Sequence, residues 1–388
     1  MRRKVLIITN LFADPFGPTR ATFNQQQFGR LSELMDVTIM VPVSWVPFVK
    51  NPLAYWRLKR EAQAKWPNAD YVIFWYVPGV ARGLHSLFLL LSLVLQRGPT
   101  LFLKRWDCML GSWGFPDAVA AVILGKLTRT PVVVKVHGSD INVFTLKWLH
   151  RVQIRWALNQ ASRVIAVSQA LAARMVQLGI RAEHTTVLYN GVDPKRFYPI
   201  DMQLARVANG IAPDDEMILF IGNILSTKGC VELLDAFVNL ASRRPKAILV
   251  YIGDGGIKKQ LQTKATQHGL TDRVRFPGRV AHAKLAPWFS AASVFCLPSY
   301  AEGVPNVVLE AMACGTPVVA TDVGGIGEIL PAFAGTLIPP RDARAIEVVL
   351  EQSLNTQWDR ARTVAHMQSF DWAKNVADLK LILDGATL

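Results

Sequence analysis

The sequence predicts an α/β protein made of two Rossmann-like domains, each a doubly wound parallel sheet. Short β-branched runs alternate with helical stretches along the 388 residues. The runs are continuously apolar, which is typical of strands covered on both faces. The series is interrupted once, by the turn-rich stretch YNGVDPKRFYPID at residues 189–201, and then starts again.

Ten runs predict the strands. In the first series they are KVLIIT (4–9), VTIMVP (37–42), YVIFWY (71–76), PVVVKVH (131–137) and RVIAVS (163–168). In the second they are MILFIG (217–222), AILVYIG (247–253), VRFPG (274–278), SVFCLPS (293–299) and PVVATD (317–322). A last stretch, DWAKNVADLKLIL at residues 371–383, predicts an amphipathic helix that no strand follows. We therefore expect a first domain of residues 1–195 and a second of residues 196–370.

The net charge of +14 is concentrated in the first half of the chain. Residues 1–199 hold 25 Lys and Arg against 10 Asp and Glu, whereas residues 200–388 hold 18 against 19. This one-sided excess predicts an anionic partner for the first half, and both a nucleic acid and an anionic membrane face qualify. The aromatic residues lie in apolar runs and no RRM, KH or helix-turn-helix pattern occurs, which disfavours nucleic acid.

The cysteines and the apolar segments indicate in which cellular compartment the protein is found. The four cysteines lie far apart with no C-x-x-C pair, which argues against a zinc site and against a secreted disulfide framework. A cytoplasmic location is expected. The apolar run in MRRKVLIITNLF is too short for a signal peptide and no small-residue cleavage site follows it. The apolar segment at residues 84–96 is shorter than the roughly 20 residues of a membrane span, so no bilayer crossing is expected.

Ligands of open parallel sheets bind beyond the carboxyl ends of the strands, so the loops there are candidate sites. In FIGNILSTKG, Gly222 and Gly229 give the loop conformational freedom, and Lys228 precedes a predicted helix. An anion is favoured there, because a helix N-terminus offers unpaired N–H groups and a partial positive charge. A solvated lysine at a helix start is the alternative. Neither a Walker A loop nor the G-x-G-x-x-G of dehydrogenases can be matched.

The stretch YAEGVPNVVLEAMACG has one acidic residue before a predicted helix start and a second one after it. Glu302 lies in the loop, Pro305 suits the first helical position, and Glu310 falls in the second turn. Gly303 lets a ligand approach the backbone, and the N–H groups of residues 304–307 can hold a phosphate. Glu310 would be costly in a core unless it is hydrogen bonded, and two ribose hydroxyls would satisfy it. The alternative is a pair of ordinary solvent-facing acids.

These residues resemble a known family. EGVPNVVLE matches the E-x7-E signature of retaining glycosyltransferases of family 4, which have the two-domain GT-B fold. The blocks VIAVSQALAARMVQLGI, YNGVDPKRFYP, GNILSTKG, GDGG and GTPVVATDVGG match the same family in order and spacing, so the resemblance covers nearly the whole chain. It implies two facing Rossmann-like domains, with the C-terminal helix, residues 371–388, crossing back onto the first. It also implies a bacterial polysaccharide glycosyltransferase of the teichuronic-acid type.

The resemblance assigns roles to particular residues. It implies that Glu310 holds the nucleotide ribose, that Lys228 neutralises the diphosphate, and that Glu302 faces the donor sugar. It implies that the following backbone, at Gly303, Val304, Pro305 and Asn306, also faces the donor, and we expect Arg279 and Val280 to flank the base. In the first domain it places His137 against the donor sugar, so we expect His137, like Glu302, to be catalytic; a structural histidine is the alternative. It places Asp140 in the loop beside His137, and Gly17 in a loop that closes over the diphosphate.

The sequence departs from the family at two positions. The family often has two adjacent glycines where this chain has Gly17 followed by Pro18. The family's arginine before the lysine of the diphosphate loop is replaced by Asn223. The diphosphate then keeps Lys228 and the helix N-termini, or a first-domain arginine such as Arg20 substitutes.

No D-x-D pair occurs, so no metal is expected to bridge the diphosphate, and Lys228 with helix N-termini would stabilise the leaving group. No cofactor is expected beyond the UDP- or GDP-sugar donor substrate. Both a Glu302 nucleophile and a front-face displacement remain open mechanisms, and retention of configuration is implied by the resemblance alone.

The resemblance also implies that the first domain binds the acceptor, which we expect to be a lipid-linked or other glycan. LHSLFLLLSLVLQRGPTLFLKRW pairs an apolar stretch with Arg97, Lys104, Arg105 and Trp106. Basic residues near an anionic leaflet contribute about 1 kcal/mol each, which predicts peripheral attachment to the inner face of the cell membrane. A buried helix beside scattered charge is the alternative. Two other functions stay open: a GT-B sugar-nucleotide epimerase, which needs no acceptor, and a basic nucleic-acid-binding protein.

Overall fold

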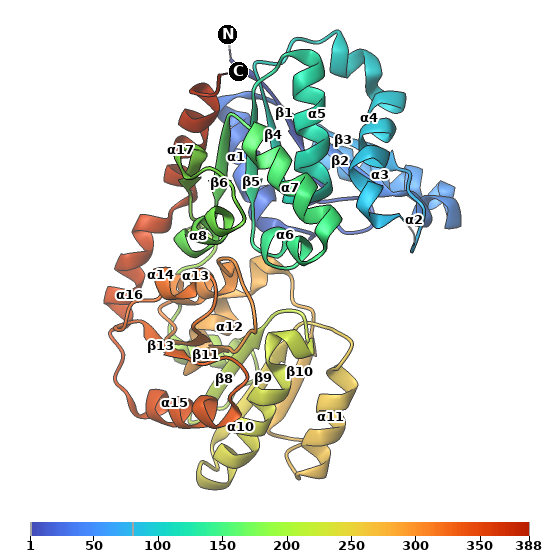
Figure 1. Cartoon of the computed structure of the whole chain (residues 1–388). Helices are drawn as coiled ribbons and strands as arrows, with labels where there is room; N and C mark the ends of the chain where they lie inside the picture. The colour runs from blue at the N-terminus through green and yellow to red at the C-terminus, as the bar shows by residue number, and fades with distance from the viewer. Residues whose placement is uncertain (1, 80, 388) are drawn as a thin grey trace. The chain divides into compact units, whose positions relative to one another are not determined.

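The computed structural model describes residues 2–79 and 81–387, which form two compact units (Figure 1). Unit 1 consists of Met1–Tyr189 and Trp372–Leu388, and unit 2 of Asn190–Asp371. The units divide between Tyr189 and Asn190, a few residues before the boundary that was expected after residue 195. The C-terminal segment belongs to the first unit, so the returning helix implied by the family resemblance is confirmed.

Unit 1 contains a seven-stranded parallel sheet in the order β3-β2-β1-β4-β5-β6-β7. The strands are β1 (Lys4–Ile8), β2 (Asp36–Ser44), β3 (Ala69–Phe74), β4 (Cys108–Ser112), β5 (Val132–Val136), β6 (Arg163–Ala166) and β7 (Thr185–Val187). In the register, Ile7 of β1 lies opposite Ile39 of β2 and Leu110 of β4. The strand order reverses between β1 and β4, and such a reversal is where an open parallel sheet binds its ligands.

Helices cover both faces of this sheet (Figure 1). They are α1 (Thr22–Leu34), α2 (Trp45–Lys50), α3 (Pro52–Lys65), α4 (His85–Phe102), α5 (Val119–Thr128), α6 (Ser139–Asn142), α7 (Trp148–Gln160), α8 (Gln169–Gln177) and α17 (Trp372–Asp384). Alternate residues of β1, Val5 and Ile7, share a core with Phe28 of α1 and Leu379 of α17. On the opposite face, α5 packs against both α4 and α7. Burial on both faces explains why the strands are continuously apolar.

A buried polar chain holds α17 to the rest of unit 1. Lys135 of β5 donates to Oε1 of Gln27 at 2.8 Å, and Gln27 donates to Oδ1 of Asn375 on α17 at 2.5 Å. Asn375 in turn donates to the carbonyl of Tyr189 at 2.5 Å. Lys135 is fully buried, and this burial lowers its pKa to about 7. The network fixes the returning helix, but it contains an ammonium group that folding removes from water.

Replacing Lys135 by methionine is expected to remove part of the pH dependence of stability. Between the folded pKa of about 7 and the ordinary value of 10.5, the unfolded chain binds more protons than the folded chain. The free energy of unfolding therefore rises with pH across this window, by at most about 1.4 kcal/mol per pH unit. The variant should lose that rise, as measured by thermal unfolding midpoints from neutral to alkaline pH. Lys50→Met, at an exposed lysine, is the control, and parallel profiles of wild type and Lys135→Met would contradict the prediction.

Unit 2 repeats the plan with a six-stranded parallel sheet in the order β10-β9-β8-β11-β12-β13. The strands are β8 (Glu216–Ile221), β9 (Ala247–Ile252), β10 (Val274–Gly278), β11 (Val294–Leu297), β12 (Val318–Thr321) and β13 (Gly335–Ile338). The helices are α9 (Met202–Ala208), α10 (Cys230–Arg243), α11 (Lys258–Gln267), α12 (Ala286–Ala291), α13 (Asn306–Ala313), α14 (Ile326–Ile329), α15 (Ala343–Asn355) and α16 (Arg360–His366). Here the strand order reverses between β8 and β11.

All ten predicted runs form strands, and the fold class of two doubly wound parallel sheets is confirmed. Strands β4, β7 and β13 were not predicted from the sequence. Their sequences, CMLGS, TTV and GTLI, are short or contain glycine, so they lack the long β-branched run that identifies a strand. The omission of β4 matters most, because this strand is central in the sheet of unit 1 and ends at Ser112 beside a predicted site residue.

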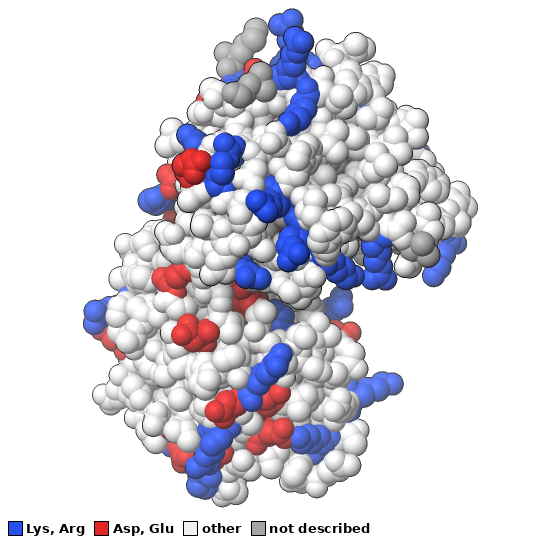
Figure 2. Space-filling view, in the orientation of Figure 1, with Lys and Arg blue, Asp and Glu red and all other residues white. Residues whose placement is uncertain are grey.

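The excess positive charge belongs entirely to unit 1. Its residues include 25 Lys and Arg against 11 Asp and Glu, whereas unit 2 has 18 of each. On the face drawn in Figure 2, basic side chains gather over unit 1 with few acids among them, while both signs are interspersed over unit 2. An anionic partner is therefore expected for unit 1 in particular.

Among the described residues, one helical segment, from Arg82 to Phe102, has the length and composition of a membrane span. An 18-residue window of this segment has a mean hydropathy of 1.2, and 33% of the window is buried. Leu89 and Leu93 are buried inside unit 1, but Leu87 and Leu91 are 46% and 47% exposed. A helix that packs one side on a sheet meets the same criteria, so the expectation that the chain does not cross a bilayer stays a prediction. The segment is longer than the apolar run at residues 84–96 suggested.

Candidate active site

The loops after β8 and β11 meet where the strand order of unit 2 reverses. Lys228, in the loop after β8, places Nζ 2.6 Å from Oε1 of Glu302, in the loop after β11. The side chains of Lys228 and Glu302 are 28% and 13% exposed, so the pair is partly shielded from water. The sequence singled out both residues separately, and the structure brings them into contact at the edge where a ligand would bind.

Glycines allow these loops to approach closely. Gly229 has φ 67°, and a Cβ atom there would collide with the carbonyl of Pro298 after β11. Gly324, in the loop after β12, has φ 60°, and a Cβ atom there would collide with the carbonyl oxygen of Glu302. The N–H of Gly325 also donates to the carbonyl of Gly303 at 2.7 Å. The backbone around Glu302 is therefore held by two neighbouring loops.

Gly324→Ala is expected to displace the Glu302 loop and lower both stability and activity. Strain at a positive φ together with the collision should cost about 1–3 kcal/mol, measured as a lower thermal unfolding midpoint. Gly269→Ala is the matched control, because Gly269 also has a positive φ, 68°, but a Cβ atom there meets nothing within 4 Å. Equal loss of activity in both variants would show that the contact with Glu302 is unimportant.

Glu310 is buried in the second turn of α13, with 5% of its surface exposed. Its Oε1 lies 2.7 Å from Nε2 of His282. Its Oε2 makes no hydrogen bond within the described residues, and neither does Nδ1 of His282. A buried carboxylate oxygen without a donor is costly, so the site is built to receive a hydroxyl or N–H from a ligand.

Helix α13 begins one residue later than predicted. Pro305 is the N-cap residue, with ψ 118°, and Asn306 is the first helical residue. The φ of proline suits either position, so the extended ψ, set by the loop that carries Glu302, decides the boundary. Val304 is buried, and Oδ1 of Asn306 accepts a hydrogen bond from Asn190 at 3.1 Å.

Three further predicted residues of unit 2 lie on loops at the same edge of the sheet. Asn223 is exposed after β8, and its carbonyl accepts from the N–H of Leu225 at 2.9 Å. Arg279 and Val280 follow β10, and Arg279 is exposed. In the strand order β10 is separated from β8 by β9, so these two residues lie further from Lys228 than Glu302 does along the sheet. Their contacts with a base stay a prediction.

In unit 1, His137 and Asp140 lie after β5, beside the end of β4. Nε2 of His137 is 2.9 Å from Oγ of Ser112. Asp140 accepts hydrogen bonds from the N–H groups of Gly114 and Gly138, both at 2.8 Å, and so ties the loops after β4 and β5 together. Burial lowers the pKa of His137 well below its usual range and raises the pKa of Asp140. His137 is therefore a neutral imidazole at pH 7.

Gly17 and Arg20 lie after β1. The N–H of Gly17 donates to Oδ1 of Asp14 at 2.9 Å, which closes a turn. Arg20 lies 3.4 Å from Oδ2 of Asp14 and 3.5 Å from Oδ1 of Asn10. An exposed guanidinium that is anchored on one side can still reach an anion. That Arg20 substitutes for the family's arginine, which is Asn223 in this chain, stays a prediction.

Sequence reasoning missed Asp117, Ser112 and His282. Asp117 is fully buried after β4, where it accepts from the N–H of Asn10 at 2.7 Å, and burial raises its pKa to about 8. An acid in the apolar stretch WGFPDAVAAV was a usable signal, of the same kind as Glu310. It was not recognised because β4, whose end places it, was not identified.

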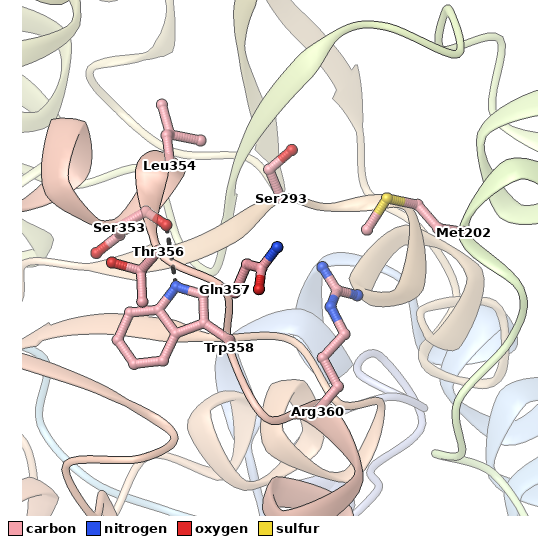
Figure 3. A pocket seen from close by; sticks show the side chains of 8 residues that line it. All are labelled: Met202, Ser293, Ser353, Leu354, Thr356, Gln357, Trp358 and Arg360. Atoms are coloured by element: carbon pink, nitrogen blue, oxygen red, sulfur yellow. Dashed lines mark hydrogen bonds between the residues drawn. The ribbon is translucent and has the colours of Figure 1, made fainter.

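A cavity of unit 2, of about 450 Å³, is lined by none of the site residues described above (Figure 3). Gln357 and Arg360 point toward its centre, and Nε1 of Trp358 donates to the carbonyl of Ser353 at 2.9 Å along one wall. Ser293, which also lines it, immediately precedes β11 and therefore lies at the amino edge of the sheet. Parallel sheets bind ligands at the opposite edge, so we assign this cavity no part in the reaction.

Two α/β units, each with a parallel sheet that carries polar side chains and helix starts at its carboxyl edge, are typical of the GT-B class of glycosyltransferases. Residues 201–368 match the family described as glycosyl transferases group 1, and residues 54–196 match glycosyltransferase family 4. The chain belongs to the family 4 glycosyltransferases.

Two relatives illustrate the match. The chain is 29% identical over 358 residues to TuaC of Bacillus subtilis (strain 168), a glycosyltransferase whose name places it in teichuronic acid biosynthesis, with 88% of this chain and 87% of TuaC covered. It is 31% identical over 312 residues to the D-inositol 3-phosphate glycosyltransferase of Arthrobacter sp. (strain FB24), with 76% and 73% covered.

Solved structures share the fold. Anabaena HepE in complex with UDP superposes with a TM-score of 0.75 at 20% identity, covering 98% of this chain and 99% of that chain. The lipopolysaccharide outer core galactosyltransferase WaaB, in its apo form, superposes with a TM-score of 0.70 at 16% identity, covering 98% and 99%. The GT-B fold is therefore confirmed.

Proposed function

We propose that this protein is a retaining glycosyltransferase that moves a sugar from a UDP- or GDP-sugar to a lipid-linked glycan in cell-surface polysaccharide or glycolipid synthesis. The buried Glu310 carries the proposal, because its free Oε2 matches the ribose hydroxyls of a nucleotide. The role of TuaC in teichuronic acid synthesis, given by its name, supports a polysaccharide product. UDP and UDP-glucose in the Anabaena HepE structures support a uridine donor.

The chemistry that we propose needs only residues of this chain. The bond between the anomeric carbon of the donor and its phosphate oxygen breaks, and the acceptor hydroxyl oxygen forms the new bond on the same face. The acceptor proton passes to the leaving phosphate. Lys228 and the first N–H groups of α13 would stabilise the charge that develops on that phosphate, without a metal or cofactor.

The contact between Lys228 and Glu302 supports the front-face displacement over a Glu302 nucleophile. A carboxylate that is held 2.6 Å from an ammonium group is stabilised and hence less nucleophilic. Glu302 would then orient Lys228 and the donor sugar. Donor hydrolysis that accumulates a covalent sugar on Glu302 would instead support double displacement.

Binding and transfer test the proposed function separately. Thermal unfolding with UDP, GDP and their sugars identifies the base, and the preferred sugar nucleotide is then given, isotope-labelled, to an extract of membrane lipid. The expected result is label in the lipid fraction with the anomeric configuration of the donor. An altered sugar nucleotide formed without any acceptor would show an epimerase, and stabilisation by neither nucleotide would refute the proposal.

We further propose that unit 1 attaches to the inner face of the cell membrane. The exposed side of α4 presents Leu87, Leu91 and Leu95, which are 46%, 47% and 82% exposed and lie on one face at helical spacing. Lys104 and Arg105 follow the helix, and Arg105 is exposed. An apolar ridge beside basic residues in a strongly basic unit fits an anionic leaflet.

Two of the residues expected at this surface are corrected by the structure. Trp106 is only 6% exposed, with the ammonium group of Lys104 over its ring at 4.2 Å. Arg97 is bound by Asp70, with Nη2 2.7 Å from Oδ1. The indole packs into the core because the chain turns inward toward β4, and the guanidinium neutralises an acid of β3. Trp106 is therefore not available to a lipid surface, and Arg97, whose side chain is 31% exposed, is already paired with Asp70.

Replacing Leu87, Leu91 and Leu95 together by glutamine is expected to weaken binding to anionic vesicles by at least about tenfold, because each buried leucine contributes about 1.5–3 kcal/mol. Co-sedimentation with phosphatidylglycerol vesicles measures the change, and added salt should weaken binding of the wild type. Leu381→Gln, at a 68% exposed leucine of α17, is the control. Wild-type protein that stays in solution at low salt would refute membrane attachment.

A further inference from the structure

A large cavity of unit 1 opens where its strand order reverses. It has a volume of about 720 Å³ and is lined by residues that follow β1 and β4, by the ends of β2 and β3, and by the starts of α4 and α7. All of its lining residues belong to unit 1. Its place at the reversal between β1 and β4 is where a parallel sheet binds a ligand.

Aromatic rings form the walls of this cavity. The rings of Phe115 and Phe144 meet His150 edge-on, with centroids 4.5 Å and 6.0 Å from that of the imidazole. On another wall, Tyr76 lies 5.0 Å from the ring of His85. Trp113 also lines the space. Aromatic surface interrupted by a few polar groups suits a ligand with an apolar face and hydroxyl edges, as a pyranose ring has.

Two imidazoles that line the cavity, one buried (His150) and one partly exposed (His85), each have a buried ring nitrogen without a partner among the described residues. Nδ1 of His150 and Nε2 of His85 make no hydrogen bond to any described residue, and His150 is only 8% exposed. Burial lowers the pKa of both rings, so they are neutral near pH 7 and can donate or accept. Unpaired buried polar atoms are costly, and ligand hydroxyls would pair them.

Three basic side chains line the cavity: Arg20, after β1, and Arg82 and Lys147, which lie near two helix starts. Arg82 begins the short 3-10 turn Arg82–Leu84 that leads into α4, Lys147 is the N-cap residue of α7, and both are exposed. Neither helix has a side-chain cap at this end, and neither has an acid in its first turn. Cations at helix N-termini oppose the helix dipole, so this arrangement is unfavourable unless an anion binds between them.

We infer that this cavity binds the acceptor as a phosphorylated sugar, with Arg82, Lys147 and the starts of α4 and α7 on the phosphate and His85 and His150 on the sugar hydroxyls. The inference rests on the proposed function and names the acceptor class for unit 1. The phosphate could belong to a lipid-linked sugar or to a free sugar phosphate. The lipid source is favoured by continuity, because the same helix α4 that begins at the cavity carries the exposed leucines onward.

Calorimetric binding to the full-length protein tests the phosphate contact. N-acetylglucosamine phosphate should bind at least about tenfold more tightly than N-acetylglucosamine, and Arg82→Ala or Lys147→Ala should each remove about tenfold of that affinity. Arg174→Ala, at a partly exposed arginine of α8 outside the cavity, is the control and should change nothing. Equal affinity for the two sugars, or unchanged affinity in both variants, would overturn the inference.

A second pair of measurements identifies the role of the imidazoles and the source of the phosphate. His150→Phe should weaken binding of the sugar phosphate more than that of inorganic phosphate, and an equal effect on both would overturn the assignment of the hydroxyls. A short-chain prenyl diphosphate sugar should bind more tightly than the sugar phosphate and lose the gain in the triple leucine variant. If it binds no better, the cavity takes a free sugar phosphate.

Measuring UDP binding distinguishes a failure of this inference from a failure of the proposed function. The Arg82, Lys147 and His150 variants should bind UDP as the wild type does, which also shows that they are folded. Wild-type protein that binds sugar phosphate but no nucleotide would refute the proposed transfer reaction and leave the cavity assignment standing.

Discussion

Glu310→Ala should weaken binding of the donor nucleotide by about 100-fold, or about 2.7 kcal/mol, because the variant loses a buried carboxylate that accepts from the ribose. The carboxylate is 5% exposed and one of its oxygens has no donor among the described residues, so ligand hydroxyls are the missing partners. Isothermal titration with UDP, or with GDP if that base is preferred, measures the change.

Two companion variants make the result for Glu310 interpretable. Asp272→Asn removes an exposed acid of unit 2 and should leave the affinity unchanged. His282→Phe removes the hydrogen bond to Oε1 while keeping Glu310, and a smaller loss is expected because the carboxylate is then present but less firmly oriented. If folded Glu310→Ala binds the nucleotide as tightly as the wild type, the assignment of Glu310 to the nucleotide site is refuted.

Lys228→Met should lower kcat by about 100- to 1000-fold, because loss of one group that stabilises the charge of a transition state costs about 2.7–4 kcal/mol. The ammonium group lies beside the start of α10 and contacts Glu302, so its removal takes away both a cation for the diphosphate and the partner of a partly buried carboxylate. Steady-state rates with saturating donor and acceptor give the effect.

Glu302→Gln separates the two roles of Lys228. If the lysine acts on the leaving group, Lys228→Met should weaken UDP binding while Glu302→Gln should not, and the double variant should be at least as slow as Lys228→Met. Lys246→Met, which breaks an exposed ion pair with Asp214, controls for the loss of a lysine from unit 2. Equal defects in UDP affinity for Lys228→Met and Glu302→Gln would assign the lysine a structural role only.

Local sequence determined the architecture of this protein. Continuously apolar, β-branched runs located ten strands, since strands buried on both faces have no polar positions. The turn-rich stretch near residue 195 located the division into two units, and the string from Glu302 to Glu310 located a helix start with a buried acid. These features depend on residues close together in the chain, which is why they could be read without a structure.

Tertiary structure alone decided which of these residues meet. Strand order brings Lys228 to Glu302 across 74 positions and sets His282 against Glu310 across 28, and no local pattern encodes such contacts. It also decided that Trp106 is buried, and that the starts of α4 and α7 line one cavity with Arg82 and Lys147. The physical reason is that parallel strands place distant loops along one edge, so the chemistry of the site depends on the order of the sheet.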